Sequence, residues 1–174
     1  MKIFFKIMLI VSLVASFQLQ AWSQMSYALN PEAQAKLASL SFLEGTWKGT
    51  GWMMGENRVK MTFEQEERVQ FQLSGTVLQI EGKGRADGKT VHHALAMIQS
   101  GTEDGKFEFT SFLQNGLRGT YPARWENNQL IWQPTEQVRY VIKLNDQGQW
   151  FEVGEYDAGG TWYQFFEMTL DKVK

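Results

Sequence analysis

The amino-acid sequence predicts an all-β fold, a single antiparallel up-and-down β-barrel of about ten strands with a short N-terminal helix. Two observations lead to this prediction. Apolar and polar residues alternate from Thr46 onward, which is typical of strands with one face in water. Turn sequences such as MGEN, ADGK and NDQG also recur at short intervals, between runs rich in β-branched and aromatic residues.

The first 21 residues have the layout of a secretory signal peptide. Lys2 and Lys6 precede an apolar run from Ile7 to Phe17, and the small residue Ala21 follows as the expected cleavage point. The run is shorter than the roughly 20 residues of a membrane-spanning helix. We therefore expect a periplasmic or secreted protein with no transmembrane segment in the mature chain.

The segment NPEAQAKLASLSFL is predicted to form the helix. Asn30 suits the N-cap, Pro31 the first helical position and Glu32 the positive end of the helix dipole. The apolar stripe that should pack against the barrel consists of Leu37, Leu40 and Leu43.

The strands follow one another without long connections, so sequence neighbours should pair. They are expected near residues 46–54, 58–73, 76–85, 90–99, 106–114, 117–126, 129–133, 137–144, 149–156 and 161–171. A barrel is favoured over a two-layer sandwich, the alternative, because closure leaves no exposed edge strands. The chain thus divides into a signal peptide (1–21), an N-terminal segment with the helix (22–44) and a barrel domain (45–174).

The composition disfavours nucleic acid as a partner and excludes covalent links through cysteine. The 17 basic residues are not clustered and are outnumbered by 19 acidic ones, so nucleic acid is not an expected partner. Cysteine is absent, which excludes disulfides and a lipid anchor on cysteine. We expect a soluble domain that is stabilised by its core.

The stretch FLEGTWKGTG opens the first strand and carries a family resemblance. Gly45-Thr46-Trp47, behind a short helix, resembles the G-x-W signature of the calycin superfamily, which includes the lipocalins and fatty-acid-binding proteins. The resemblance implies that Trp47 closes one end of the barrel. It also implies that a basic residue near the end of the last strand, Lys172 or Lys174, crosses the ring of Trp47 in a cation–π contact.

Within this superfamily the chain looks closest to nitrobindin-like proteins and to a group of uncharacterised secreted bacterial barrels. Nitrobindins hold ferric haem through a histidine on the final strand. The matching segment here, WYQFFEMTLDKV, has Phe165 and Phe166 in that neighbourhood and no histidine. Haem is therefore disfavoured, and no cofactor is expected.

Polar residues within an inward apolar register are the candidate ligand contacts, because burying an unpaired polar group costs about 1–3 kcal/mol. Gln65 and Glu67 continue the odd-numbered face of Phe63 and Val69 on the second strand. Either they anchor a ligand, or a bulge turns them to solvent. On the segment QWFEVGEYD both faces are partly apolar, so either Glu152 or Glu155 could point inward.

His92 and His93 are adjacent on one strand, so only one can face the interior. A neutral histidine there could orient a ligand, or it could be a structural residue. Adjacent strand residues cannot converge on one ion, and no metal site is predicted. The candidate interior residues are Phe63, Gln65, Glu67, His92, His93, Phe109, Tyr140, Glu152, Tyr156 and Phe166.

These features favour an exported, lipocalin-like protein that binds a small hydrophobic or amphipathic molecule without catalysis. No serine in a nucleophile elbow, no cysteine and no metal spacing is found in the sequence. One alternative is an isomerase or lyase that uses Glu67, a neighbouring histidine, and Tyr140 or Tyr156 for acid–base chemistry. The other is a barrel filled by its aromatic residues, with a structural or partner-binding role.

Overall fold

The computed structural model describes residues 27–173, and both the expected signal peptide at 1–21 and Lys174 lie outside this range. The elements are α2 (Pro31–Ala38), the 3₁₀ helix η1 (Ser41–Leu43), β1 (Gly45–Met54), β2 (Lys60–Gln72), the 3₁₀ helix η2 (Leu73–Gly75), β3 (Val77–Ala86), β4 (Lys89–Ser100), β5 (Lys106–Leu113), β6 (Arg118–Glu126), β7 (Gln129–Thr135), β8 (Val138–Leu144), β9 (Trp150–Asp157) and β10 (Trp162–Lys172).

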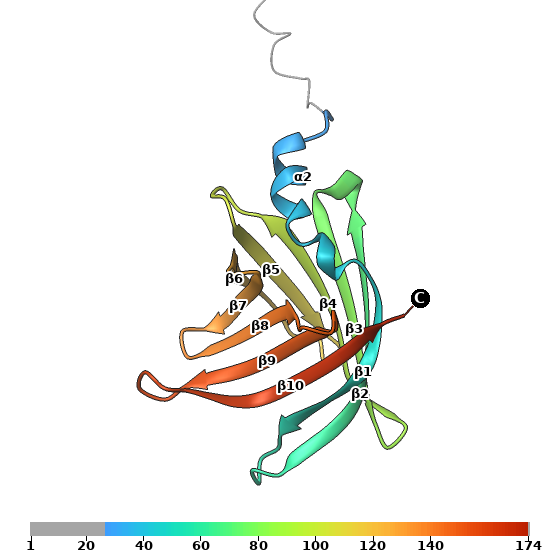
Figure 1. The fold of residues 1–174 in the computed structure, drawn as a ribbon, viewed down its shortest axis with the longest axis vertical. Coiled ribbons are helices and arrows are strands. Elements are labelled where there is room, and N and C mark those ends of the chain that lie inside the picture. Colours follow the sequence, from blue (N-terminus) through green and yellow to red (C-terminus); the bar gives the residue numbers. More distant parts are fainter. Residues whose placement is uncertain (1–26, 174) are drawn as a thin grey trace, which may run out of the picture.

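The strands form a closed antiparallel barrel in which every strand pairs with its neighbours in sequence (Figure 1). Closure comes from β1 and β10, whose register runs from the pair Trp47 and Lys172 to the pair Met53 and Phe166. The predicted up-and-down barrel of ten strands is confirmed, and the sandwich alternative is wrong.

The predicted single helix is wrong in its second half. Helix α2 ends at Ala38, and the amides of Leu40 and Leu43 donate to the carbonyls three residues earlier, at 3.0 and 3.1 Å. In a 3₁₀ arrangement side chains three residues apart lie above one another. This geometry aligns the leucine stripe on one side, and Leu37, Leu40 and Leu43 are all 0% exposed.

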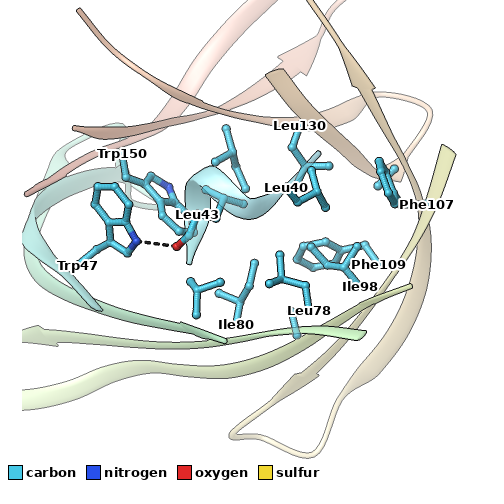
Figure 2. Close-up of a cluster of buried hydrophobic side chains, with 14 of the residues drawn as sticks. Leu40, Leu43, Trp47, Leu78, Ile80, Ile98, Phe107, Phe109, Leu130 and Trp150 are labelled. Carbon is cyan, nitrogen blue, oxygen red and sulfur yellow. Dashed lines mark hydrogen bonds between the residues drawn. The ribbon is translucent and has the colours of Figure 1, made fainter. Parts of the chain in front are cut away.

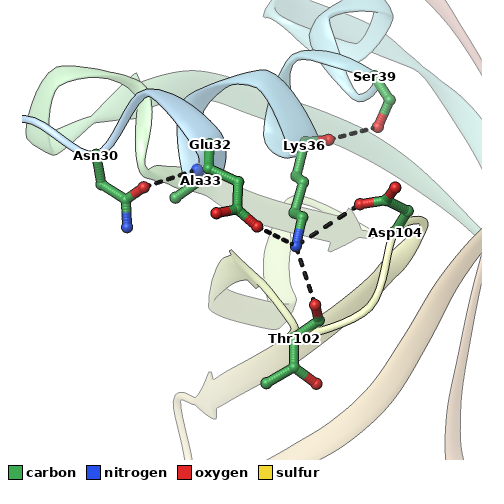
Figure 3. Close-up of polar contacts among 7 residues, drawn as sticks. All are labelled: Asn30, Glu32, Ala33, Lys36, Ser39, Thr102 and Asp104. Carbon is green, nitrogen blue, oxygen red and sulfur yellow. Dashed lines mark hydrogen bonds and ion pairs between the residues drawn. The ribbon is translucent and has the colours of Figure 1, made fainter.

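Polar contacts fix the helix to the rim of the barrel (Figure 3). The predicted cap is confirmed, since Asn30 Oδ1 accepts a 3.0 Å hydrogen bond from the Ala33 amide. Lys36 Nζ lies 2.9 Å from Glu32 Oε1 on the same helix. It also reaches the loop between β4 and β5, where it donates to Thr102 O at 3.0 Å and lies 3.6 Å from Asp104 Oδ1. These contacts seat the leucine stripe in the barrel end.

The core fills the end of the barrel that α2 and η1 close (Figure 2). Trp47 donates a 2.7 Å hydrogen bond from Nε1 to Leu43 O, which joins the first strand to the plug. The rings of Trp47 and Trp150 meet edge to face at 5.9 Å. The buried cluster around them includes Val69, Leu78, Ile80, Ile98, Phe107, Leu130, Ile142 and Leu170. Within residues 27–173, no helix has the length and apolar character needed to cross a membrane.

Candidate functional site

The G-x-W residues adopt the geometry that the calycin resemblance implies. Lys172 Nζ lies 5.1 Å from the centre of the Trp47 ring. Gly45 has φ +129°, which disfavours any residue with a side chain, and a Cβ there would lie 2.7 Å from Lys172 Cε. Gly45 therefore leaves room for the lysine side chain to reach the tryptophan. Gly45, Trp47 and Lys172 therefore belong to the closed end of the barrel, where Trp47 is part of the buried core.

Gln65 and Glu67 point into the barrel from β2. Gln65 pairs with Gly49 and Gly84, and Glu67 pairs with Trp47 and Gly82. Both side chains are 6% exposed. The β2 register runs without a bulge through these positions, so the bulge interpretation is wrong.

Glu152 is the inward carboxyl group of β9, and it is 7% exposed. Its cross-strand neighbours are Met168 on β10 and Ile142 on β8, both buried in the core. Glu155 lies on the outer face, where its Oε2 atom is 2.7 Å from Arg139 Nε. The choice between Glu152 and Glu155 is thereby settled, and Arg139 is not available as a counter-charge inside the barrel.

Each buried carboxyl group accepts a hydrogen bond from a residue two positions earlier on its own strand. Gln65 Nε2 donates to Glu67 Oε1 at 2.6 Å. Trp150 Nε1 donates to Glu152 Oε2 at 3.1 Å. Side chains two apart share a face of a strand, which makes such bonds possible inside the barrel. One oxygen of each carboxyl group is thus held by the protein.

The remaining oxygens are unpaired. Among the residues that the structure describes, no side chain or amide donates to Glu67 Oε2, Glu152 Oε1 or Gln65 Oε1. No ion pair joins either carboxyl group to a basic side chain in the same range. The interior therefore presents hydrogen-bond acceptors that lack protein donors.

Burial changes the acidity of both carboxyl groups. Desolvation raises the pKa of Glu67 to about 7, against a lowering by the Gln65 hydrogen bond and a further increase from the charge of Glu81. Desolvation likewise raises the pKa of Glu152 to about 8, with an additional increase from the charge of Glu67 and a lowering by the Trp150 hydrogen bond. The charge of Glu67 therefore makes ionisation of Glu152 less favourable.

Glycines on the neighbouring strand make room for these side chains. A Cβ at Gly82 would lie 2.6 Å from Glu67 Oε1, and one at Gly84 would lie 2.7 Å from Gln65 Oε1. Both polar side chains therefore lie along the wall, over β3. The same relation recurs at Gly154, where a Cβ would lie 2.9 Å from Tyr140 Cε1.

Stacked aromatic rings form another part of the inner wall. The Trp132 ring lies between those of Phe109, at 4.4 Å and 2°, and Tyr140, at 4.5 Å and 8°. Phe63 and Phe166 stack at 5.8 Å. Burial, followed by the charge of Glu152, raises the pKa of Tyr140 to about 12, so its hydroxyl group stays protonated at neutral pH. Trp132 Nε1 is buried and has no partner within residues 27–173.

The remaining candidates lie at the rim or outside. His92 is in the inward register opposite Gly84 but is exposed, and desolvation, followed by the charge of His93, lowers its pKa. His93 faces outward, with Nε2 3.0 Å from Glu81 Oε1, so its placement among the interior candidates is wrong. Tyr156 shares the inward face of β9 and is 43% exposed.

An open groove of about 620 Å³ adjoins the interior candidates at Phe63, which is one of its lining residues. It is lined by parts of β1, β2, β10 and the β3–β4 turn, among them Thr50, Trp52, Thr62, Glu64, Arg85 and Glu167. The inward carboxyl groups do not line it. Among residues 27–173, no group of three or more histidine, cysteine or acidic side chains could hold a metal ion.

Comparison with known proteins supports the fold. The chain is similar to the crystal structure of Rv2717c from M. tuberculosis, with a TM-score of 0.63 and 15% identity over 84% of this chain and 100% of that chain. No protein-family model matches the sequence, and no curated protein does. The likeness shows a shared barrel, which fits a calycin-like fold.

Sequence reasoning missed the way in which Glu67 and Glu152 are brought within electrostatic reach. Alternation placed Glu67 on the inward face of its strand and left Glu152 undecided, because both faces of β9 are partly apolar. The available signal was the repeated spacing of Gln65 to Glu67 and Trp150 to Glu152, a donor followed two positions later by an acid.

Proposed function

We propose that this protein binds one small amphipathic molecule inside the barrel and does not transform it. The observation that carries the proposal is the set of three acceptor atoms without a protein donor, on Gln65, Glu67 and Glu152, in the same interior as an aromatic wall. Tyr140 of this wall is within electrostatic reach of Glu152. Ligand sites in proteins combine mostly apolar walls with a few placed polar groups. The interior has both parts.

The exposure of the aromatic residues supports a container over a filled barrel. Phe63, Trp132, Tyr140 and Phe166 all occupy inward positions, yet each is only partly buried. Side chains that filled a solid core would be excluded from solvent, as the leucines and tryptophans of the closed end are. The aromatic end of the interior is therefore accessible.

The arrangement of titratable groups favours binding over catalysis. The enzyme alternative requires a histidine within hydrogen-bond reach of Glu67. The hydrogen-bond partner of Glu67 is Gln65, His93 faces outward, and His92 is exposed at the rim. No acid–base pair of the expected kind is assembled.

The wider biological setting is part of the same proposal. We place the protein in the calycin superfamily on the geometry of Gly45, Trp47 and Lys172, and outside the haem-binding nitrobindins on the phenylalanines at 165 and 166. With a signal peptide at 1–21, binding would occur in the periplasm or outside the cell.

A fluorescence titration with N-phenyl-1-naphthylamine, a neutral apolar probe, tests the proposal. Ala94 points inward beside Gly82, whereas Leu95 points outward on the same strand. We expect Ala94→Phe to weaken probe binding by about tenfold, because the added ring occupies interior space. Leu95→Phe should leave it within about twofold.

Circular dichroism and the melting temperature establish that both variants are folded. The proposal is contradicted if the folded wild type does not bind the probe. It is equally contradicted if the inward and outward phenylalanines have the same effect.

A further inference from the structure

We propose that the interior site selects an organic cation, a primary ammonium group carried on an apolar body. The inference rests on the proposed function, since it names the chemical class of the ligand. It comes from three features of the interior: the number of unpaired acceptors, the missing counter-charge and the aromatic wall.

The acceptors match the donors of an ammonium group. Gln65 Oε1, Glu67 Oε2 and Glu152 Oε1 have no donor among the described residues and belong to side chains that are 6%, 6% and 7% exposed. Within residues 27–173, the fully buried side-chain polar atom without a partner is Trp132 Nε1, so these oxygens keep some contact with solvent. An ammonium group offers three N–H donors and no acceptor. A carboxylate ligand has no donor of its own, and it could accept from Glu67 or Glu152 only where these groups are protonated.

The lack of a basic partner for Glu67 and Glu152 also favours a cationic ligand. The basic residues close to these strands are used elsewhere: Lys48 and Arg68 pair with Glu66 on the outer face, at 3.0 and 2.8 Å. Lys172 covers Trp47 at the closed end. Glu67 and Glu152 are buried without a basic partner, so their raised pKa values of about 7 and 8 keep them protonated until the pH exceeds those values. A cationic ligand would supply the positive charge that their ionised forms lack.

The aromatic rings suit both parts of such a ligand. The stack of Phe109, Trp132 and Tyr140 offers apolar area for the body of the molecule. Aromatic faces also attract a cation, most strongly where water is excluded. A neutral ligand would use the apolar area alone.

Binding of a cation should release protons. The titratable groups that interact electrostatically with these two carboxyl groups are Glu81 on β3, which acts on Glu67, and Tyr140 on β8, on which Glu152 acts. His92 on β4 and Tyr156 on β9 share the inward register, while the inward positions Gly49 and Gly51 of β1 carry no titratable group. A bound cation favours the ionised carboxyl groups, so protons leave as the amine enters. Affinity should therefore rise from about pH 5.5 to about pH 8.

A matched series of ligands tests the inference by isothermal titration calorimetry. The series is 2-phenylethylamine, 2-phenylethanol and 3-phenylpropanoate, which are positive, neutral and negative at pH 7.5. We expect the amine to bind about tenfold tighter than the alcohol, with the acid weakest. Repeating the amine titration in phosphate and Tris buffers measures the protons released.

Three variants test whether the interior carboxyl groups cause the preference for the amine. Glu67→Gln and Glu152→Gln keep the shape of the side chain and should remove most of the preference for the amine while leaving alcohol binding within about threefold. Glu64→Gln removes an exposed carboxyl group from the outer face of β2. It should change neither the preference for the amine nor the binding of the alcohol. Alcohol binding also shows that the variants remain folded.

The outcomes separate this inference from the proposed function. Equal or tighter binding of the alcohol or the acid overturns the choice of a cation, as does the absence of binding by the whole series when N-phenyl-1-naphthylamine still binds. Loss of amine binding in Glu64→Gln alone overturns the interior location. Failure of the naphthylamine to bind, or equal effects of Ala94→Phe and Leu95→Phe on its binding, overturns the proposed function itself.

Discussion

Lys172 Nζ lies 5.1 Å from the centre of the Trp47 ring, at the position where the last strand of the barrel pairs with the first. The contact joins two residues that are distant in sequence and adjacent only because the barrel closes. Trp47 also donates to Leu43 O, so it holds the helical plug and both closing strands together.

We predict that Trp47→Phe lowers the free energy of unfolding by about 2–4 kcal/mol, because it removes a buried hydrogen bond and leaves a cavity. Lys172→Met should cost only about 0.5–1 kcal/mol, the usual size of an exposed cation–π contact. Urea denaturation measures both. Lys106→Met, at an exposed lysine of β5, is the control. Similar losses for the two test variants would contradict this account of the closed end.

Gly49 provides the second prediction. A Cβ at this position would overlap the carbonyl oxygen of Thr169 and lie 2.9 Å from Leu170 Cα, both backbone atoms of β10. The backbone cannot move aside without separating the closing strands. Gly49→Ala should therefore cost about 3 kcal/mol or more, or prevent folding.

Thr50→Ala is the matched control for this prediction, since Thr50 is exposed on the outer face of the same strand. It should change the unfolding free energy by less than about 0.5 kcal/mol. A wild-type-like denaturation midpoint for Gly49→Ala would mean that β1 and β10 are not paired closely there.

Stability should fall as the pH rises. Between the ordinary carboxyl pKa of 4.5 and the raised values of about 7 and 8, the folded state holds more protons on Glu67 and Glu152 than the unfolded state does. The free energy of unfolding therefore decreases with pH over this range. At about pH 8, Glu67→Gln should be more stable than wild type, by about 1–3 kcal/mol.

Urea denaturation at pH 5.5 and pH 8 measures this dependence. Glu67→Gln should flatten it, whereas Glu64→Gln should leave it unchanged, since that exposed carboxyl group is not desolvated. A wild type that is more stable at pH 8 than at pH 5.5 would show that the buried carboxyl groups are ionised in the folded state.

Most of the fold was predictable because strand alternation and turn chemistry are local signals. The ten strands begin and end within about two residues of their expected positions, which is the usual uncertainty of an element boundary. The helix was the exception. The spacing of Leu37, Leu40 and Leu43 suits a 3₁₀ turn as well as an α-helix, and the space inside the barrel end decides between them.

The site was predictable only strand by strand. Alternation placed Gln65 and Glu67 on the inward face, and the fact that neighbours point apart allowed only one of His92 and His93 inside. Which faces of β4 and β9 turn inward depends on cross-strand register. The electrostatic pairing of Glu67 with Glu152 depends on closure of β1 with β10, and a local pattern cannot reveal it.

The most direct test is a crystal structure of the protein grown with saturating 2-phenylethylamine. We predict that the ammonium nitrogen lies within about 3.5 Å of a carboxyl oxygen of Glu67 or Glu152, with the phenyl ring against the aromatic wall. Density for the amine in the open groove beside Trp52, without density for it in the barrel interior, would contradict the account.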